Sequence, residues 1–195
     1  MVRTARAIQS LAFALAGVAM ISAPVAIAQS TRPSSSDQKL LSDFTKKAKD
    51  YIDKEHMLTT DKMKPTADVA KLQQDREQLR DAVQQARANA RQGDFFTAET
   101  AEVFRKLLSN LLKSPDGKKV KTSLNHAEPG ASAEFKVNSD FPNQNGQPIQ
   151  SVPPTVLKVL PALPKGLEYC IAGRTLALRD STANLVVDYL PNALP

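Results

Sequence analysis

The sequence predicts an α+β fold in which three helices precede a small antiparallel β-meander. Apolar residues recur at helical spacing from about residue 37 to residue 113, and they alternate with polar residues over the last thirty. Proline divides the chain at the same place, because ten of its 13 prolines follow residue 113. We therefore expect a helical bundle over residues 37–113, a proline-rich irregular linker with short elements over 114–165 and a three-strand meander over 166–195.

The first 28 residues have the three zones of a signal peptide. Arg3 and Arg6 give a positively charged start, residues 8–21 are uncharged and rich in Ala and Leu, and Ala26-Ile27-Ala28 is a small-x-small cleavage signal. The apolar stretch is short for a membrane-spanning helix, which requires roughly 20 apolar residues. We expect cleavage after Ala28, a flexible leader over 29–36, and a soluble periplasmic or secreted protein without an integral membrane span. The alternative is an uncleaved N-terminal anchor.

Charge and cysteine content narrow the class of protein. Removal of residues 1–28 lowers the net charge from +6 to +4, and charges of both signs are mixed along the chain. Export argues against a nucleic-acid partner, and we expect none. Cys170 is the only cysteine, so no intrachain disulfide can form and apolar burial must hold the fold together.

Three helices are expected in the first half, over residues 37–56, 66–92 and 98–112. Thr97 is the expected N-cap of the third, and Phe96 could pack on Ala101 as a hydrophobic staple. Gly93 is the expected stop of the second helix, whose near-heptad stripe Arg76 interrupts; the stripe consists of Leu72, Leu79, Val83, Ala86 and Ala90. Pro115-Asp116-Gly117 is expected to end the helical half.

The linker gives weaker signals. Residues Ala133 to Val137 alternate weakly and predict a short strand, while Pro153-Pro154 predicts a helical turn over Thr155–Leu160. Leu160-Pro161-Ala162-Leu163-Pro164 is expected to be extended, because proline disfavours helix at the residue before it.

The meander has turns at Gly173-Arg174 and at Asp180–Ala183, and one of its faces is apolar. We expect that face to cover the helical half or, failing that, a partner protein. Alternation places Cys170 on the opposite face beside Glu168, which predicts an accessible, non-catalytic thiol; the competing interpretation is a buried cysteine acting as a small apolar residue. The expected apolar face consists of Leu167, Tyr169, Ile171, Leu176, Leu178, Leu185, Val187 and Tyr189.

Two stretches together resemble a family of bacterial exported proteins to which no activity is assigned. The first is Ala90-Arg91-Gln92-Gly93-Asp94-Phe95-Phe96-Thr97, continuing to Phe104-Arg105. The second consists of Val152-Pro153-Pro154, Leu160-Pro161-Ala162-Leu163-Pro164, Leu167-Glu168-Tyr169, Gly173-Arg174, Leu176-Ala177-Leu178-Arg179-Asp180 and Ala183-Asn184-Leu185-Val186-Val187-Asp188. The resemblance covers most of the mature chain, and it carries over no functional residue.

The chain departs from the pattern of that family at two positions. Cys170 stands where the family usually has Arg, and Ala98 stands where it often has Pro. The C-terminal thirty residues also loosely resemble the C-terminal module of RcnB-type periplasmic proteins, which are linked to nickel and cobalt homeostasis. This second resemblance carries over no metal ligands.

The sequence assigns no catalytic residue, no cofactor-binding residue and no metal ligand. His56, His126 and Cys170 lie in different segments, and His126-Ala127-Glu128 is the closest approach to a ligand pair. Motifs of the GxSxG, GxGxxG and P-loop types are absent. A Cys-His nucleophile using Cys170 has no local activating group, and the many acidic pairs fit charged helix faces.

Four arginines fall near one side of the second expected helix: Arg76, Arg80, Arg87 and Arg91. They fit either a basic strip for an acidic partner or headgroups, or, as we favour, an ordinary solvated face. Our leading hypothesis is a non-enzymatic exported protein acting through contacts with an unknown protein partner. The alternatives are a periplasmic metal-homeostasis or stress-response protein of the RcnB type, and an enzyme with an unrecognised site.

Overall fold

A computed structural model describes residues 33–59, 67–126, 134–142 and 150–195. The expected signal peptide, residues 1–28, and residues 29–32 of the expected leader lie outside this part. The α+β prediction is confirmed, with helices α1 to α3 packed together before an antiparallel sheet. The elements are α1 (Ser35–Thr59), α2 (Val69–Ala86), α3 (Ala98–Lys113), α4 (Gly117–His126), β1 (Gln150–Ser151), α5 (Pro154–Leu157), β2 (Leu167–Ala172), β3 (Thr175–Asp180) and β4 (Leu185–Leu190).

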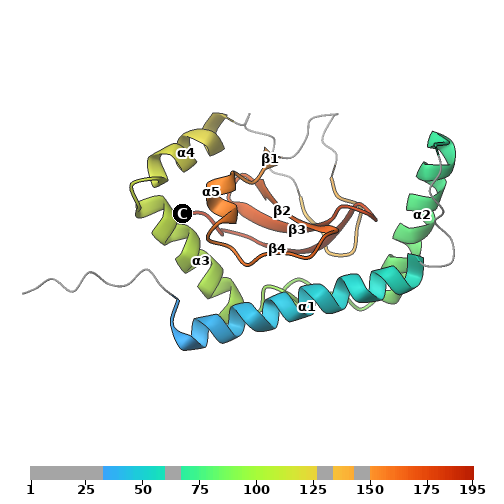
Figure 1. Cartoon of the computed structure of the whole chain (residues 1–195), viewed down its shortest axis with the longest axis horizontal. Coiled ribbons are helices and arrows are strands. Elements are labelled where there is room, and N and C mark those ends of the chain that lie inside the picture. The colour runs from blue at the N-terminus through green and yellow to red at the C-terminus, as the bar shows by residue number, and fades with distance from the viewer. Residues whose placement is uncertain (1–32, 60–66, 127–133, 143–149) are drawn as a thin grey trace, which may run out of the picture. The chain divides into compact units, whose positions relative to one another are not determined.

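The sheet has the order β1-β2-β3-β4, and each neighbouring pair is antiparallel. Its three long strands lie side by side in Figure 1 and occupy the stretches that alternation predicted. The turn at Gly173 has φ +56°, a left-handed conformation that glycine adopts without a Cβ penalty. The two-residue strand β1, which pairs with Cys170 and Ile171, was not predicted.

A register shift in β4 changes which side chains face the helices. Arg179 pairs with Val186, but the preceding Leu178 pairs with Asp188, so Val187 is the extra residue of a β-bulge. Partners opposite each other share a face, and Leu178 belongs to the core shared with the helices. Asp188 therefore faces the helical half. The expectation for Tyr189 is wrong, because Tyr189 packs on the other side of the sheet.

One apolar core joins the helical half to the inner face of the sheet, as expected. The Phe44 ring of α1 lies 4.9 Å from the Phe104 ring of α3 and 6.5 Å from the Tyr169 ring of β2, between centroids. Leu176, Leu178 and Leu185 are fully buried in the same cluster. Removing the sheet would therefore expose the apolar faces of both α1 and α3.

A second, smaller cluster covers the outer face of the sheet, and it corrects the prediction for Cys170. The thiol does face away from Tyr169 and Ile171, but Cys170 is only 5% exposed. Phe135 and Phe141, from the segment 134–142, pack over it with Val186. The predicted strand at Ala133–Val137 is also wrong for its described residues: 134–137 form irregular chain and a turn, while Asp140 makes an isolated bridge to Leu185.

The boundaries of the helices follow their caps. The Thr97 hydroxyl accepts the N–H of Thr100 at 3.3 Å, which confirms the predicted N-cap of α3. The second helix is shorter than expected, because Arg87 ends α2 and residues 87–97 form turns. Its predicted stop, Gly93, instead lies in those turns, with φ +92°.

Helix α4 contradicts the prediction that Pro115-Asp116-Gly117 ends the helical half. Pro115 and Asp116 form a tight turn, and α4 begins directly after them at Gly117. A Cβ at Gly117 would lie 2.1 Å from the Leu112 carbonyl oxygen, so the turn requires glycine there. Only Val120 and Leu124 give α4 an apolar spacing, which is too little signal for a helix prediction.

The described residues all belong to one compact unit, Thr31–Pro195. The predicted helical turn after Pro153 is present as α5, which ends at Leu157 rather than Leu160, and residues 161–164 lie outside the helices and strands. Among the described helices, none is both long enough and apolar enough to span a bilayer.

Candidate functional site

A pocket of about 440 Å³ lies between α1, α2 and the turn before α3. Helical spacing on α1 brings several charged side chains to its wall, and α2 and the turn close the other side. Such a volume falls in the range of small-ligand sites, about 300–1,000 Å³. The lining residues are Lys47, Asp50, Tyr51, Lys54, Glu55, Leu58, Val83, Ala86, Arg87, Asp94 and Phe95.

Two buried acids and a phenol meet where α1 contacts the sheet. The Tyr51 hydroxyl donates to Asp180 Oδ2 at 2.6 Å, and Asp180 is fully buried. Burial, and then the nearby Asp180 carboxylate, raise the pKa of Glu55 to about 7, although a side-chain hydrogen bond with Thr182 lowers it. The same burial raises the pKa of Tyr51 far above its usual range. The sequence did not single out Glu55, which is only 3% exposed.

Arg87 lines the pocket and is half-buried. Its Nη2 donates to the Val187 carbonyl at 2.9 Å, and its guanidinium carbon lies 5.2 Å from the centre of the Tyr51 ring. Nη1 is buried and has no hydrogen-bond partner within the described residues. The guanidinium therefore links α2 to the bulge of β4.

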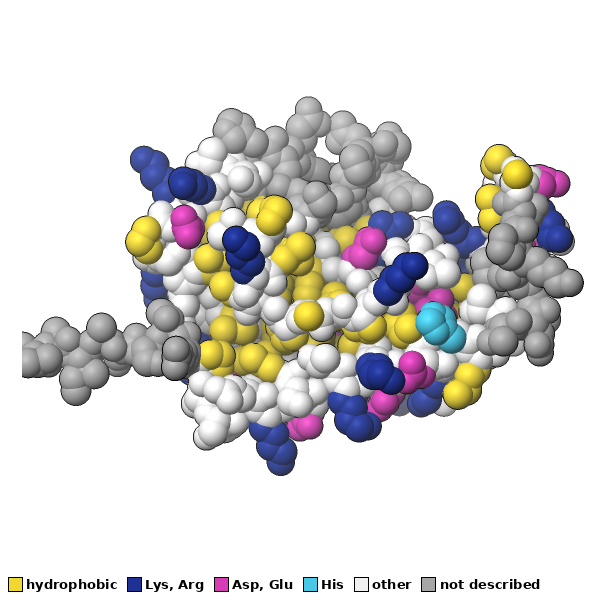
Figure 2. Space-filling view, in the orientation of Figure 1, with side chains coloured by type: hydrophobic (Ala, Val, Ile, Leu, Met, Phe, Trp, Pro, Cys, Tyr) yellow, Lys and Arg dark blue, Asp and Glu magenta, His cyan; other side chains and the backbone are white. Residues whose placement is uncertain are grey.

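The charged groups at the rim already have partners. Lys46 pairs with Asp50 at 2.9 Å, and Asp94 accepts the Arg91 N–H at 2.9 Å. Lys47 donates to the Asp94 carbonyl oxygen. Figure 2 shows basic and acidic side chains interspersed along the exposed face of α1, which agrees with these pairs. Lys47, Asp50 and Asp94 therefore reach a ligand only in competition with these contacts.

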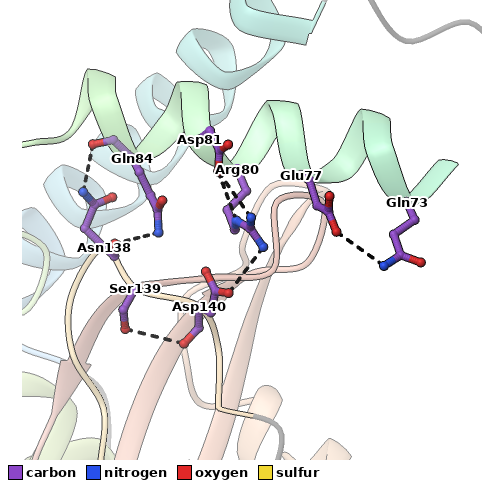
Figure 3. A network of polar contacts seen from close by, with 8 residues as sticks. All are labelled: Gln73, Glu77, Arg80, Asp81, Gln84, Asn138, Ser139 and Asp140. Carbon is purple, nitrogen blue, oxygen red and sulfur yellow. Dashed lines mark hydrogen bonds and ion pairs between the residues drawn. The ribbon is translucent and has the colours of Figure 1, made fainter. Parts of the chain in front are cut away.

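The second half of α2 is held against the segment 138–140 by a polar network, drawn in Figure 3. Arg80 bonds both Asp81 and Asp140 at 3.3 Å. Gln84 donates to the Asn138 carbonyl at 3.2 Å, and Asn138 returns a bond to the Gln84 carbonyl at 2.9 Å. Leu79, on the same half of the helix, is buried in the core.

The first half of α2 has a different environment. Val69 is 75% exposed and Leu72 is 45% exposed, although both continue the stripe that is buried at Leu79 and Val83. Apart from Asp75, every residue over 67–78 is exposed. Hydrophobic side chains are visible on this free end of α2 in Figure 2. An apolar helix face is thus left open to solvent.

The four arginines of the expected strip do not form one surface. Arg76 and Arg91 are exposed, but Arg80 belongs to the polar network and Arg87 lines the pocket. The prediction of a solvated face is therefore right for Arg76 and Arg91 and wrong for the other two arginines.

The candidate metal ligands lie on separate elements: His56 on α1, His126 at the end of α4 and Cys170 on β2. Within the described ranges no group of three or more His, Cys, Asp and Glu residues is placed to hold a metal ion. Ala127 and Glu128 of the short motif His126-Ala127-Glu128 lie outside those ranges. Burial also raises the pKa of the Cys170 thiol to about 11, which is opposite to what a nucleophile or thiolate ligand needs.

No protein-family model, no curated protein and no solved structure matches the chain.

Proposed function

We propose that this chain is an exported, soluble and non-catalytic protein that binds another protein through the first half of α2. The observation that carries the proposal is the exposed apolar face at Val69 and Leu72. An apolar stripe normally turns toward a partner, because helices gain most of their stability from packing. Here the stripe meets the core at Leu79 and runs outward from there.

The nature of the exposed segment supports a protein partner rather than a small molecule. The segment is a convex helix surface, and about two turns separate Leu72 from the buried Leu79. A small molecule needs a concavity, whereas the groove of another protein accepts an amphipathic helix. Asp68 caps the start of α2 by accepting the Ala70 and Lys71 N–H groups, so the exposed turns are shaped before the partner binds.

The occupied side chains of the pocket support the absence of catalysis. A general acid or base must be within reach of substrate, but Tyr51 donates to Asp180 and Glu55 is almost fully buried. Asp50 and Asp94 are engaged at the rim. The pocket thus presents few groups free to move a proton.

Export and partner binding can be tested in one strain that secretes the tagged chain. Mass spectrometry of the mature protein should give an N-terminus at Gln29; retention of residues 8–21 would contradict export by cleavage. A photo-cross-linking residue placed at Leu72 should join the chain to another protein in the periplasm. The same residue at the exposed Glu102 of α3 is the matched control and should not. Equal labelling at both positions, or none at Leu72, would count against the proposal.

The pocket favours a second candidate, which is binding or conversion of a small ligand. Its volume and its charged rim are the supporting observations. Replacing Ala86 by Phe would fill the pocket, while Ala88→Phe places the same ring on an exposed residue outside the lining. If only Ala86→Phe disturbs the cellular role of the protein, the pocket is the functional site.

The metal-homeostasis alternative is tested by calorimetry with nickel, cobalt, copper and zinc. A specific site would bind one of them with a dissociation constant below about 100 µM and would need clustered N, O or S ligands. We expect weaker binding or none.

A further inference from the structure

The buried carboxyl groups of Glu55 and Asp180 connect the C-terminal half of α1 to the β3–β4 turn. Both of them bond to Thr182. Thr182 donates its backbone N–H to Asp180 Oδ1 at 2.8 Å, and a side-chain hydrogen bond joins Thr182 to Glu55. Asp180 also accepts the Tyr51 hydroxyl and the Ala183 N–H. A Cβ atom on Gly166 would lie 3.8 Å from Glu55 Oε2. The Glu55 carboxyl group therefore packs next to the backbone that precedes β2.

The surroundings of Glu55 hold a second acid but no cation that pairs with it in the described part of the chain. On α1 its titratable neighbour at the contact is Tyr51, from β3 it faces Asp180, and the 164–167 segment contributes the Gly166 backbone. Just after α2, Arg87 lines the same pocket, lies over the Tyr51 ring and donates to Val187. Three donors satisfy the Asp180 carboxylate, whereas among the described residues the Glu55 side chain has a single hydrogen-bond partner, Thr182.

We infer that this contact is a pH-sensitive latch: Glu55 is protonated when α1 is docked on the β3–β4 turn, and loss of that proton frees the end of α1 and reshapes the pocket. A second carboxylate beside Asp180, almost fully buried, would carry an uncompensated charge. Solvating it requires the last turn of α1 to move away from Gly166 and Thr182. A periplasmic protein meets such pH changes, since that compartment follows the medium; the inference does not depend on the proposed partner.

The direction of the effect follows from the two protonation states. The pKa of Glu55 is raised to about 7 in the folded chain from 4.5, so the folded state holds a proton that the unfolded state has lost. The latch therefore contributes its full stability below pH 4.5 and loses it as the pH rises through 7. Between pH 5 and pH 8 the unfolding equilibrium constant should increase by roughly ten- to a hundredfold.

Backbone NMR of the full mature chain between pH 5 and pH 8 tests the inference. The amides of residues 52–59 and of 180–183 should shift together with one midpoint near pH 7. In Glu55→Gln, which cannot ionise, both sets should remain in their low-pH positions. Glu102→Gln makes the same chemical change at an exposed site and should leave the transition intact. His56 is the next residue on α1 and has an ionisable imidazole, so His56→Asn is the second control and should keep the transition.

Chemical denaturation of the same variants gives an independent measurement. The wild-type chain and both controls should lose stability between pH 5 and pH 8, while Glu55→Gln should be nearly flat over that interval. If the amide chemical shifts of the wild-type chain do not change between pH 5 and pH 8, the latch is contradicted. A transition that persists unchanged in Glu55→Gln or disappears in His56→Asn would contradict it as well.

Discussion

The Asp188 carboxylate accepts the backbone N–H of Phe95 at 2.8 Å, although the two residues are 93 positions apart. It also accepts the N–H groups of Phe96 at 2.9 Å and of Gly93 at 3.0 Å. The turns between α2 and α3 have no regular structure of their own, so these bonds fix them on β4. Asp188 therefore fixes the turns that lead from α2 to α3 beside the pocket.

Replacing Asp188 by Asn should destabilise the fold by about 2–3 kcal/mol. The amide keeps one acceptor oxygen, but its NH₂ group would face backbone donors, and charge-assisted bonds would be lost. Urea denaturation at pH 7 measures the change. Asp43→Asn, at an exposed position on α1, is the matched control and should change stability by less than about 0.5 kcal/mol. Similar losses in both variants would mean that Asp188 does not hold the turns.

Cys170 should react with a thiol reagent only after the protein unfolds. The aromatic side chains of 134–142 cover it, and with its pKa near 11 only about one thiol in a thousand is ionised at pH 8. Phe141→Ala opens the cover and should accelerate labelling of the folded protein. Fast, stoichiometric labelling of the wild-type chain would show instead that the outer face of the sheet is uncovered.

The cap of α3 should be worth on the order of 1 kcal/mol. In Thr97→Ala the Thr100 N–H loses its side-chain acceptor, which lies 3.3 Å away in the native protein. The midpoint of thermal or urea unfolding reports the loss. Thr122→Ala, at an exposed position within α4, serves as the control and should leave the midpoint nearly unchanged. An unchanged midpoint in Thr97→Ala would mean that α3 does not depend on this cap.

Deletion of residues 166–195 should make the chain aggregate or unfold without cooperativity. The helices share their core with Leu176, Leu178 and Leu185, so the deletion would expose the apolar faces of α1 and α3. Size-exclusion chromatography and circular dichroism distinguish the outcomes. A truncated chain that remains monomeric and equally stable would show that the helical half folds alone.

The fold was predictable where periodicity acts locally. Alternation located β2, β3 and β4, and the Thr97 cap located the start of α3. Alternation failed at Tyr189 and Asp188, because the bulge at Val187 inserts one residue and inverts the following faces. It also could not anticipate that Phe135 and Phe141 would cover Cys170, since that contact joins segments distant in sequence.

The candidate sites were largely invisible in the sequence. Glu55 follows Tyr51 and Ile52 at helical spacing and so lies on the buried face of α1, but an acid at such a position gives no sequence signal that it is buried. Arg87 looked like part of a basic strip, but the end of α2 turns it toward Tyr51. The exposure of Leu72 did have a sequence signal. Arg76 interrupts the apolar stripe, and Leu72 lies before this charged residue while the buried Leu79 lies after it.

The most direct test of the proposed docking surface changes Leu72 while a photo-cross-linking residue at Val69 reports on contact with another protein in the strain that produces the chain. Leu72→Lys should reduce the yield of cross-linked protein at least tenfold, because it puts a charge into the apolar contact. Gln78→Lys introduces the same charge at an exposed position on the same helix, and it should leave the yield unchanged. A yield that survives Leu72→Lys, or one that falls equally in both variants, would contradict a partner seated on the first half of α2.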